Sequence, residues 1–158
     1  MDLTIRPLTR DDADSVVRMH DDFLDYLKSL GDPDGEIREF TKERYLVDGF
    51  GTDPVFSGYI ALSDSEPRGY LLYCKGYNVD LAYRLFFICD LWVDPKQRRG
   101  GVGRALVKKC AADCKAWGGQ WLEWYVYKPN TMALDFYRRL GGTVSDQLVI
   151  MSARSEAL

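Results

Sequence analysis

The chain has 158 residues, of which 46% are hydrophobic and 28% charged, and its formal net charge is −3. This composition is typical of one globular domain with a core, and it excludes a disordered chain. It lacks the basic excess of a nucleic-acid-binding domain, and no apolar stretch reaches the roughly 20 residues that a membrane-spanning helix needs. The first residues also lack the order of a signal peptide, so we expect a cytoplasmic protein.

The sequence predicts a single domain, 1–158, without repeats or linkers. Its apolar periodicity and turn residues predict, in chain order, a strand at 3–6, a helix from a capping box at Thr9 to Gly31, a helix at 36–48 ended by Gly49 and Gly51, and strands at 55–62 and 69–74 joined by a turn at 63–68. There follow a buried strand at 85–93, a helix at 101–117, a strand at 120–127, a helix at 130–140 and one or two strands within 143–152. This order combines hairpins with a strand–helix–strand crossover. We therefore expect an α/β (α+β) fold with a mixed sheet and helices on both faces.

The cysteines and the histidine limit the available metal and nucleophile chemistry. Because no two cysteines form a Cys-x-x-Cys pair, we interpret Cys74, Cys89, Cys110 and Cys114 as reduced core thiols. His20 is the only histidine, which excludes a histidine-rich zinc site, and a Ser-His-Asp arrangement would have to use it. The sequence therefore predicts no bound metal.

A glycine-rich loop with three arginines lies between the strand at 85–93 and the helix at 101–117. Gly101 and Gly103 permit a positive φ and close approach of the backbone to a ligand. The helix behind them presents unpaired amides and a positive dipole end, an anion site suited to a pyrophosphate, to which Arg98, Arg99 and Arg104 can add charge. Two phosphate-binding motifs are excluded, because Gly103 is not followed by Lys-Ser/Thr and the third glycine of a Rossmann loop is missing. The alternative is a tight turn with solvated arginines.

The pattern Arg98-x-x-Gly101-x-Gly103, after a strand and opening a helix, resembles motif A of the GNAT superfamily of N-acetyltransferases. The resemblance extends from Ile5-Arg6-Pro7 to the run Asn130-x-x-Ala133-x-x-Phe136-Tyr137-x-x-Leu140-Gly141. It implies the GNAT acyl-CoA N-acyltransferase fold over the whole chain, with acetyl-CoA as cosubstrate and direct transfer to an amine.

Within the superfamily, the chain is most similar to the diamine (spermidine/spermine) N-acetyltransferases. The likeness is carried by Asp48-Gly49-Phe50-Gly51, by Asp90-Leu91-Trp92-Val93 and by Asn130 with Tyr137. Leu27 and Cys89 stand where that subfamily has acidic residues, which weakens the case for a polyamine substrate. The resemblance also implies a homodimer, with the last strands at its interface.

The resemblance implies a set of cofactor-binding residues. Backbone amides from Arg99 to Arg104 would hold the pyrophosphate, and the free backbone of Leu91 and Val93 would pair with pantetheine. The expected set is Leu91, Trp92, Val93, Arg98, Arg99, Gly100, Gly101, Val102, Gly103, Arg104, Asn130, Ala133 and Tyr137. The acetyl-CoA would occupy a V-shaped opening between the strand that ends at Val93 and the strand that ends near Tyr127.

Two residues are candidates for catalysis. Tyr137 lies seven residues after Asn130 on one helical face, and its phenol, with an ordinary pKa of about 10, can protonate a thiolate whose acid has a pKa of about 8.5. The alternative is a half-buried core tyrosine beside an Asn130 helix cap. Asp90 interrupts an apolar strand, where an unpaired carboxylate is costly. It is either a base or ligand for the substrate ammonium, or a structural partner of an arginine such as Arg84.

The acceptor is expected to be a small primary amine, such as a diamine, a polyamine or an amino-acid-like amine. The candidate substrate-binding residues are Tyr26, Asp90, Glu123 and Trp124. Alternatives are an antibiotic, toxin or protein amine, a catalytically silent CoA-binding module, or a nucleotide-binding protein that uses the same loop.

Overall fold

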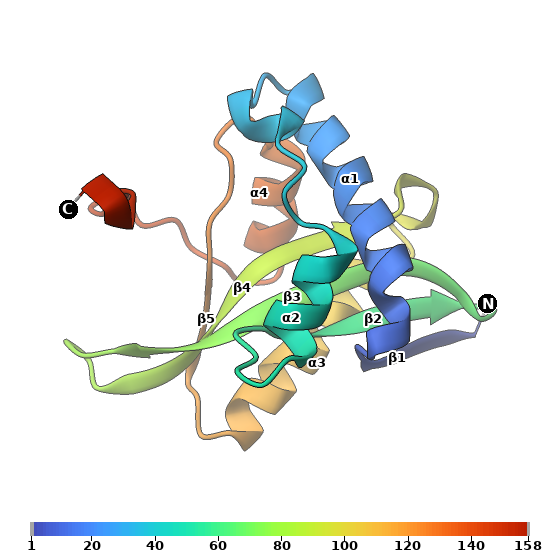
Figure 1. The fold of residues 1–158 in the computed structure, drawn as a ribbon. Coiled ribbons are helices and arrows are strands. Elements are labelled where there is room, and N and C mark those ends of the chain that lie inside the picture. Colours follow the sequence, from blue (N-terminus) through green and yellow to red (C-terminus); the bar gives the residue numbers. More distant parts are fainter. Residues whose placement is uncertain (1, 158) are drawn as a thin grey trace.

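Five strands form one mixed sheet in the computed structural model, which describes residues 2–157. They are β1 (Leu3–Pro7), β2 (Ser57–Ser63), β3 (Glu66–Asn78), β4 (Tyr83–Val93) and β5 (Trp121–Trp124), and they lie side by side in this order. The first four are antiparallel to their neighbours, whereas β5 runs parallel to β4 (Figure 1). The expected mixed sheet is therefore confirmed.

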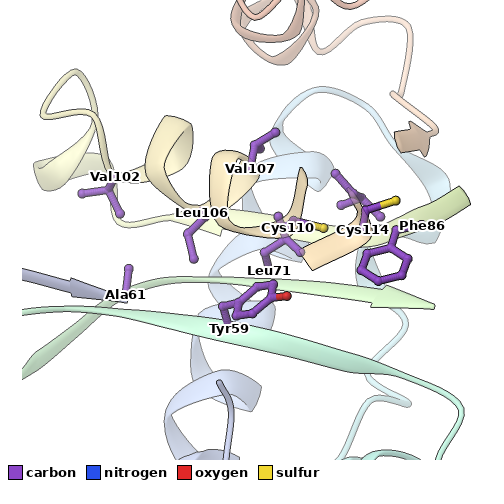
Figure 2. Close-up of a cluster of buried hydrophobic side chains, with 10 residues drawn as sticks. Tyr59, Ala61, Leu71, Phe86, Val102, Leu106, Val107, Cys110 and Cys114 are labelled. Atoms are coloured by element: carbon purple, nitrogen blue, oxygen red, sulfur yellow. The ribbon is translucent and has the colours of Figure 1, made fainter. Parts of the chain in front are cut away.

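Helices cover both faces of this sheet (Figure 1). On one face, α1 (Ala13–Ser29) and α2 (Lys42–Phe50) contribute to a buried cluster with side chains of β2, β3 and β4. On the other face, α3 (Val102–Ala116) packs its own apolar stripe against the sheet, and α4 (Thr131–Arg139) packs against the same cluster. Figure 2 shows this second cluster, with Leu106 and Cys110 of α3 above Ala61 and Leu71 of the strands.

Burial on both faces explains why the central strands read as almost continuous apolar runs. In β3, Tyr70 and Leu72 point into the α1 and α2 cluster, whereas Leu71 between them points toward α3. Successive side chains of a strand alternate between the two faces of the sheet. The central strands therefore contribute side chains to both clusters, and the sheet fixes the positions of the helices on its two faces.

The second helix is shorter than expected. It begins at Lys42, and the Thr41 hydroxyl caps it by accepting a hydrogen bond from the Arg44 amide at 3.3 Å. The expected start of the helix at residue 36 instead belongs to a short 3₁₀ turn over Pro33–Glu36. The expectation that Gly49 ends the helix was wrong, since the helix continues through it to Phe50. A Cβ at Gly49 would lie 2.7 Å from the Phe56 ring, so this glycine allows the aromatic side chain to pack on the helix.

The C-terminal segment forms no strand, which corrects the expectation for 143–152. β5 also ends at Trp124, three residues before Tyr127. The segment nevertheless has apolar side chains that are exposed, namely Val144, Leu148, Val149, Ile150 and Met151. A strand needs a partner edge for its backbone groups, and within the described chain β5 pairs with β4 alone.

The described residues include no helix with both the length and the apolarity needed to span a membrane. Within 2–157 there is also no group of three or more His, Cys, Asp or Glu side chains that could share a metal ion. All four cysteines are free thiols, but Cys89 is exposed, so its placement in the core was wrong. The cytoplasmic location and the single-domain organisation stay predictions.

An ion pair fixes the path of the chain from β1 into α1. The Arg6 guanidinium donates to both oxygens of Asp12, at 2.7 and 2.8 Å, and the Thr9 amide donates to Asp12 Oδ2 at 2.8 Å. This is one half of the capping box that the sequence predicts. Burial acts to raise the pKa of Asp12, but the bonds from Arg6 and Thr9 outweigh it, so the pKa lies below its usual value.

We predict that Asp12→Asn lowers the free energy of unfolding by about 2 kcal/mol at pH 7, because a charge-assisted bond to Arg6 is lost. The native pKa is depressed, so the stabilisation is present above about pH 4, the unfolded value, and is lost as the pH falls through the native pKa. Urea unfolding at pH 7 and at lower pH measures this difference. Asp11→Asn, an exposed change in the same turn, is the control. A difference that stays constant below pH 4 would contradict the assignment.

Candidate active site

A β-bulge interrupts the middle of β4. Leu72 of β3 pairs with Asp90 and the next residue, Tyr73, pairs with Ile88, so Cys89 has no partner on β3. Such bulges bend a strand and redirect its side chains, and they are frequent next to active sites. Here the bulge places Asp90 on the α1 side of the sheet, next to Tyr70 and His20.

The two parallel strands separate directly after this bulge. β5 pairs with β4 only as far as Ile88, which lies opposite Trp124. The last part of β4, from Asp90 to Val93, therefore has no strand on its β5 side within the described chain. The backbone groups on that edge have no strand partner and can pair with an extended ligand, although the Val93 carbonyl already accepts a hydrogen bond from Nε of Arg98.

A cleft of about 1140 Å³ lies at the end of β4, between α4 and the start of α3. It is lined by twelve of the thirteen residues that the sequence predicts for cofactor binding, the exception being Gly100. They are Leu91, Trp92, Val93, Arg98, Arg99, Gly101, Val102, Gly103, Arg104, Asn130, Ala133 and Tyr137. Tyr26, a predicted substrate residue, and Phe23, which the sequence did not single out, close the cleft from α1.

The glycine-rich loop enters α3 through a left-handed turn. Gly101 caps the helix with φ of 84°, and Arg99 has φ of 66°, which is strained for a residue with a side chain. No side chain caps the first turn of α3, so its free amides face the cleft. A Cβ at Gly103 would lie 3.3 Å from the Phe136 ring, and this close approach brings α4 beside the start of α3.

Arg98 brings a positive charge to the wall of the cleft. Its Nε donates to the Val93 carbonyl at 3.1 Å, and its guanidinium lies 4.4 Å from the Trp92 ring and 5.3 Å from the Tyr26 ring. Partial burial lowers the pKa of Arg98, although an arginine remains charged at any physiological pH. The aromatic rings thus hold the cation where an anionic ligand would approach.

Asn130 joins two helices at the far end of the cleft. Its Oδ1 accepts hydrogen bonds from the Ala133 amide and from the Tyr26 hydroxyl, both at 3.1 Å. The first bond caps α4, as the structural interpretation of this residue predicts. The second ties α1 to α4 and orients the Tyr26 ring along the cleft.

Tyr137 projects from α4 into the cleft and is clamped by aromatic neighbours. Its ring lies 4.6 Å from the Trp124 ring and 5.0 Å from the Phe136 ring. Burial, and then the negative charge of Asp90, raise the pKa of Tyr137 well above its ordinary value. The phenol therefore keeps its proton throughout the physiological range, which a proton donor requires.

Asp90 is paired, but not with the arginine considered above. Arg84 instead donates to the Trp117 carbonyl at 3.1 Å. The Asp90 carboxylate accepts a hydrogen bond from the Tyr70 hydroxyl and lies 2.9 Å from Nδ1 of His20. Sequence reasoning missed His20 because it lies 70 residues away from Asp90. A signal was present, since His20 follows the buried Val16 by one helical turn on the inward face of α1.

Three of the four predicted substrate residues, Asp90, Glu123 and Trp124, lie outside the cleft lining. Glu123 accepts a hydrogen bond from the Tyr83 hydroxyl at 3.0 Å, and Trp124 packs behind Tyr137. Their roles in substrate binding stay predictions, and the geometry gives them no contact with the cleft.

The family model described as "Acetyltransferase (GNAT) family" matches residues 17–142. The chain belongs to the GNAT family. This family uses acetyl-CoA as its cosubstrate, and the fold and the loop described above are those that the sequence resemblance implies. The chain is accordingly an acetyltransferase, as its named relatives are.

Curated relatives include the thialysine N-epsilon-acetyltransferase of Bos taurus, 28% identical over 145 residues, which cover 87% of this chain and 82% of that protein. The L-ornithine N5-acetyltransferase NATA1 of Arabidopsis thaliana is 29% identical over 97 residues, 61% of this chain and 42% of that protein.

Among solved structures, the aminoglycoside acetyltransferase meta-AAC0020 from an uncultured soil metagenomic sample, in complex with sisomicin, has a TM-score of 0.74 at 21% identity, covering 96% of this chain and 95% of its own. The F44R variant of the BH1408 protein of Bacillus halodurans has a TM-score of 0.78 at 22% identity and covers 96% and 99%. These likenesses show the shared fold.

Proposed function

We propose that this GNAT acetyltransferase transfers the acetyl group of acetyl-CoA directly to a primary amine of a small molecule. The observation that carries the proposal is the convergence, in one cleft, of the uncapped start of α3, the unpaired end of β4 and the Tyr137 phenol. These three features match the three parts of the reaction, namely a pyrophosphate to hold, an extended pantetheine to align and a thiolate to protonate.

The residues present fit an acyl-CoA. The amides after Gly101 provide a nest for the pyrophosphate, and Arg98, Arg99 and Arg104 surround it with positive charge. The free edge of β4 from Leu91 to Val93 offers backbone groups to the amides of the pantetheine arm, like an added strand. The thioester would then lie near the bulge, between Asp90 and Tyr137.

The chemistry follows from this placement. A neutral amine attacks the thioester carbonyl, and a backbone amide near Leu91 stabilises the oxyanion that develops. The carbon–sulfur bond breaks as Tyr137 donates its proton to the departing sulfur, and the amine nitrogen gives up one proton, which restores the phenol. No covalent enzyme intermediate is involved.

The acceptor class follows from the relatives and from the site. Thialysine and ornithine, named for two relatives, each carry a primary amine on a short chain that ends in an amino acid. A carboxylate at Asp90, on the α1 side of the sheet and next in the chain to Leu91 of the cleft, suits such a cationic group. We therefore propose a diamine, a polyamine or an amino-acid-like amine, with the aminoglycoside of a structural neighbour as the second candidate class.

We predict that the purified protein binds CoA and releases free thiol from acetyl-CoA when an acceptor amine is added. A panel of lysine, ornithine, thialysine, putrescine, spermidine, an aminoglycoside and a peptide, read by thiol release, measures the acceptor preference. The short diamines and diamino acids should give the highest kcat/KM. CoA binding in calorimetry without thiol release from any of these amines would indicate a silent CoA-binding module and contradict the proposal.

Tyr137→Phe should lower kcat about 100-fold, within the range for loss of a general acid, and leave the KM for acetyl-CoA almost unchanged. The reason is that the phenyl ring keeps its packing against Trp124 while the proton is lost. Steady-state kinetics with the best amine measures both constants. Tyr77→Phe, which changes an exposed tyrosine of β3, is the matched control. An unaffected kcat would remove Tyr137 from the acid role.

We also propose that the enzyme is a homodimer, assembled through the C-terminal segment and the free edge of β5. Val149 and Ile150 are 84% and 67% exposed, and an apolar segment next to an unpaired strand edge favours pairing with another chain. In a two-fold dimer, the C-terminal segment of each copy can pack against the free β5 edge of the other copy.

Light scattering after size exclusion should give twice the chain mass of 18.1 kDa for the wild type. The double variant Val149→Lys/Ile150→Lys should run with the mass of one chain, because charges replace the apolar contact. Val79→Lys/Leu81→Lys, equally exposed at the β3–β4 hairpin, should leave the mass unchanged. A wild type of one chain mass at micromolar concentration would rule out the dimer.

A further inference from the structure

A polar cluster interrupts the apolar layer between α1 and the sheet. Nδ1 of His20 lies 2.9 Å from Asp90 Oδ2 and 3.2 Å from the Tyr70 oxygen, and the Tyr70 hydroxyl donates to the same Asp90 oxygen. Tyr70 is fully buried, and the Asp90 side chain is only 10% exposed. Because Oδ2 accepts, the Nδ1 atom of His20 must carry the proton.

The two donors leave the carboxylate of Asp90 asymmetric. Both meet at Oδ2, whereas Oδ1 is buried and has no hydrogen-bond partner among residues 2–157. A buried carboxylate oxygen without a partner costs free energy. A chain that used His20 and Tyr70 only to neutralise Asp90 would gain more by satisfying both oxygens. The arrangement therefore indicates that Oδ1 is kept for a ligand.

Asp90 adjoins the cleft along the chain, although it is not one of the residues that line it. It directly follows the bulged Cys89 and precedes Leu91, which lines the cleft. After burial, the negative charge of Asp90 also contributes to raising the pKa of Tyr137. Asp90 is thus bonded to the buried pair His20 and Tyr70 and is the direct chain neighbour of a residue that lines the cleft.

We propose that His20 and Tyr70 are positioning residues, which hold Oδ2 of Asp90 so that Oδ1 receives the acceptor ammonium and takes its proton. This inference rests on the proposed function and assigns a role to two residues outside the cleft. The ammonium gives one proton to Oδ1, and its nitrogen then forms the carbon–nitrogen bond as the carbon–sulfur bond breaks. Tyr137 protonates the sulfur and regains a proton from the amine nitrogen, and Asp90 releases its proton to solvent, so the reaction releases one proton overall.

Substitutions separate positioning from simple packing. His20→Leu removes the donor, His20→Asn keeps an amide N–H near the place of Nδ1, and Tyr70→Phe removes the second donor. Tyr45→Phe is the matched control, because Tyr45 is buried in the same layer and its hydroxyl donates to the Thr9 carbonyl, not to Asp90. All four variants are first compared by thermal unfolding.

We expect His20→Leu and Tyr70→Phe to lower kcat with the amine about 10-fold while the KM for acetyl-CoA stays unchanged. His20→Asn should recover most of the loss, and Tyr45→Phe should keep the wild-type kcat even where its stability falls. If kcat is unchanged in His20→Leu and Tyr70→Phe, or follows stability equally in all four variants, the positioning role is wrong.

A second measurement does not depend on turnover. His20 is the only histidine, so the imidazole nitrogens of protein without a histidine tag give a single set of NMR signals. We expect the wild type to show a protonated Nδ1, and we expect this signal to move in Asp90→Asn and on addition of CoA with a diamine. If the wild type acetylates no amine, the proposed function fails. If the imidazole signals are the same in wild type and Asp90→Asn, the positioning inference fails, whatever the turnover.

Discussion

The separation of β4 from β5 after Ile88 is the constraint on which the rest of the site depends. As long as the two parallel strands pair, every backbone group between them is used within the sheet. Once they part, the end of β4 becomes an interior edge, and such an edge needs an extended partner. The bulge at Cys89 coincides with this point and turns Asp90 toward α1. In the proposed function, an extended ligand pairs with this edge and so continues the sheet where β5 has left it.

The start of α3 is placed by the same sheet. The loop from Asp94 to Gly101 is short, so the helix begins close to the end of β4, and its first turn points at the space that the strands leave open. Gly103 then allows Phe136 of α4 to pack at van der Waals distance. Packing therefore brings the helix dipole, the free amides and the arginines to the same end of the cleft. The turn into α3 requires a positive φ at Arg99, which is strained for a residue with a side chain.

Much of this arrangement could be predicted from the sequence, because its signals are local. In the loop at 98–104 and in the run from Asn130 to Tyr137, the residue types and their spacing determine the local backbone structure. Residues of both segments line the cleft as expected. The strand at 143–152 was wrong because an apolar pattern does not specify which edge a strand will pair with. The structural alternative for Asp90, a pairing with Arg84, was also wrong, since its partner His20 comes from a helix that only the tertiary fold places beside β4.

The two faces of the sheet differ in their chemistry, and the polar cluster around Asp90 lies on only one of them. The α3 face is apolar around Leu106 and Cys110 and gives a rigid support for the loop. The α1 face contains, within an equally apolar layer, a histidine and a tyrosine that both bond to the same carboxylate oxygen of an aspartate. Side chains of a strand alternate between faces, so Leu91 and Asp90 look in opposite directions although they are adjacent. In the proposed reaction, one strand end therefore presents backbone groups to the cofactor and a carboxylate to the amine, which are the two reactants that the enzyme must bring together.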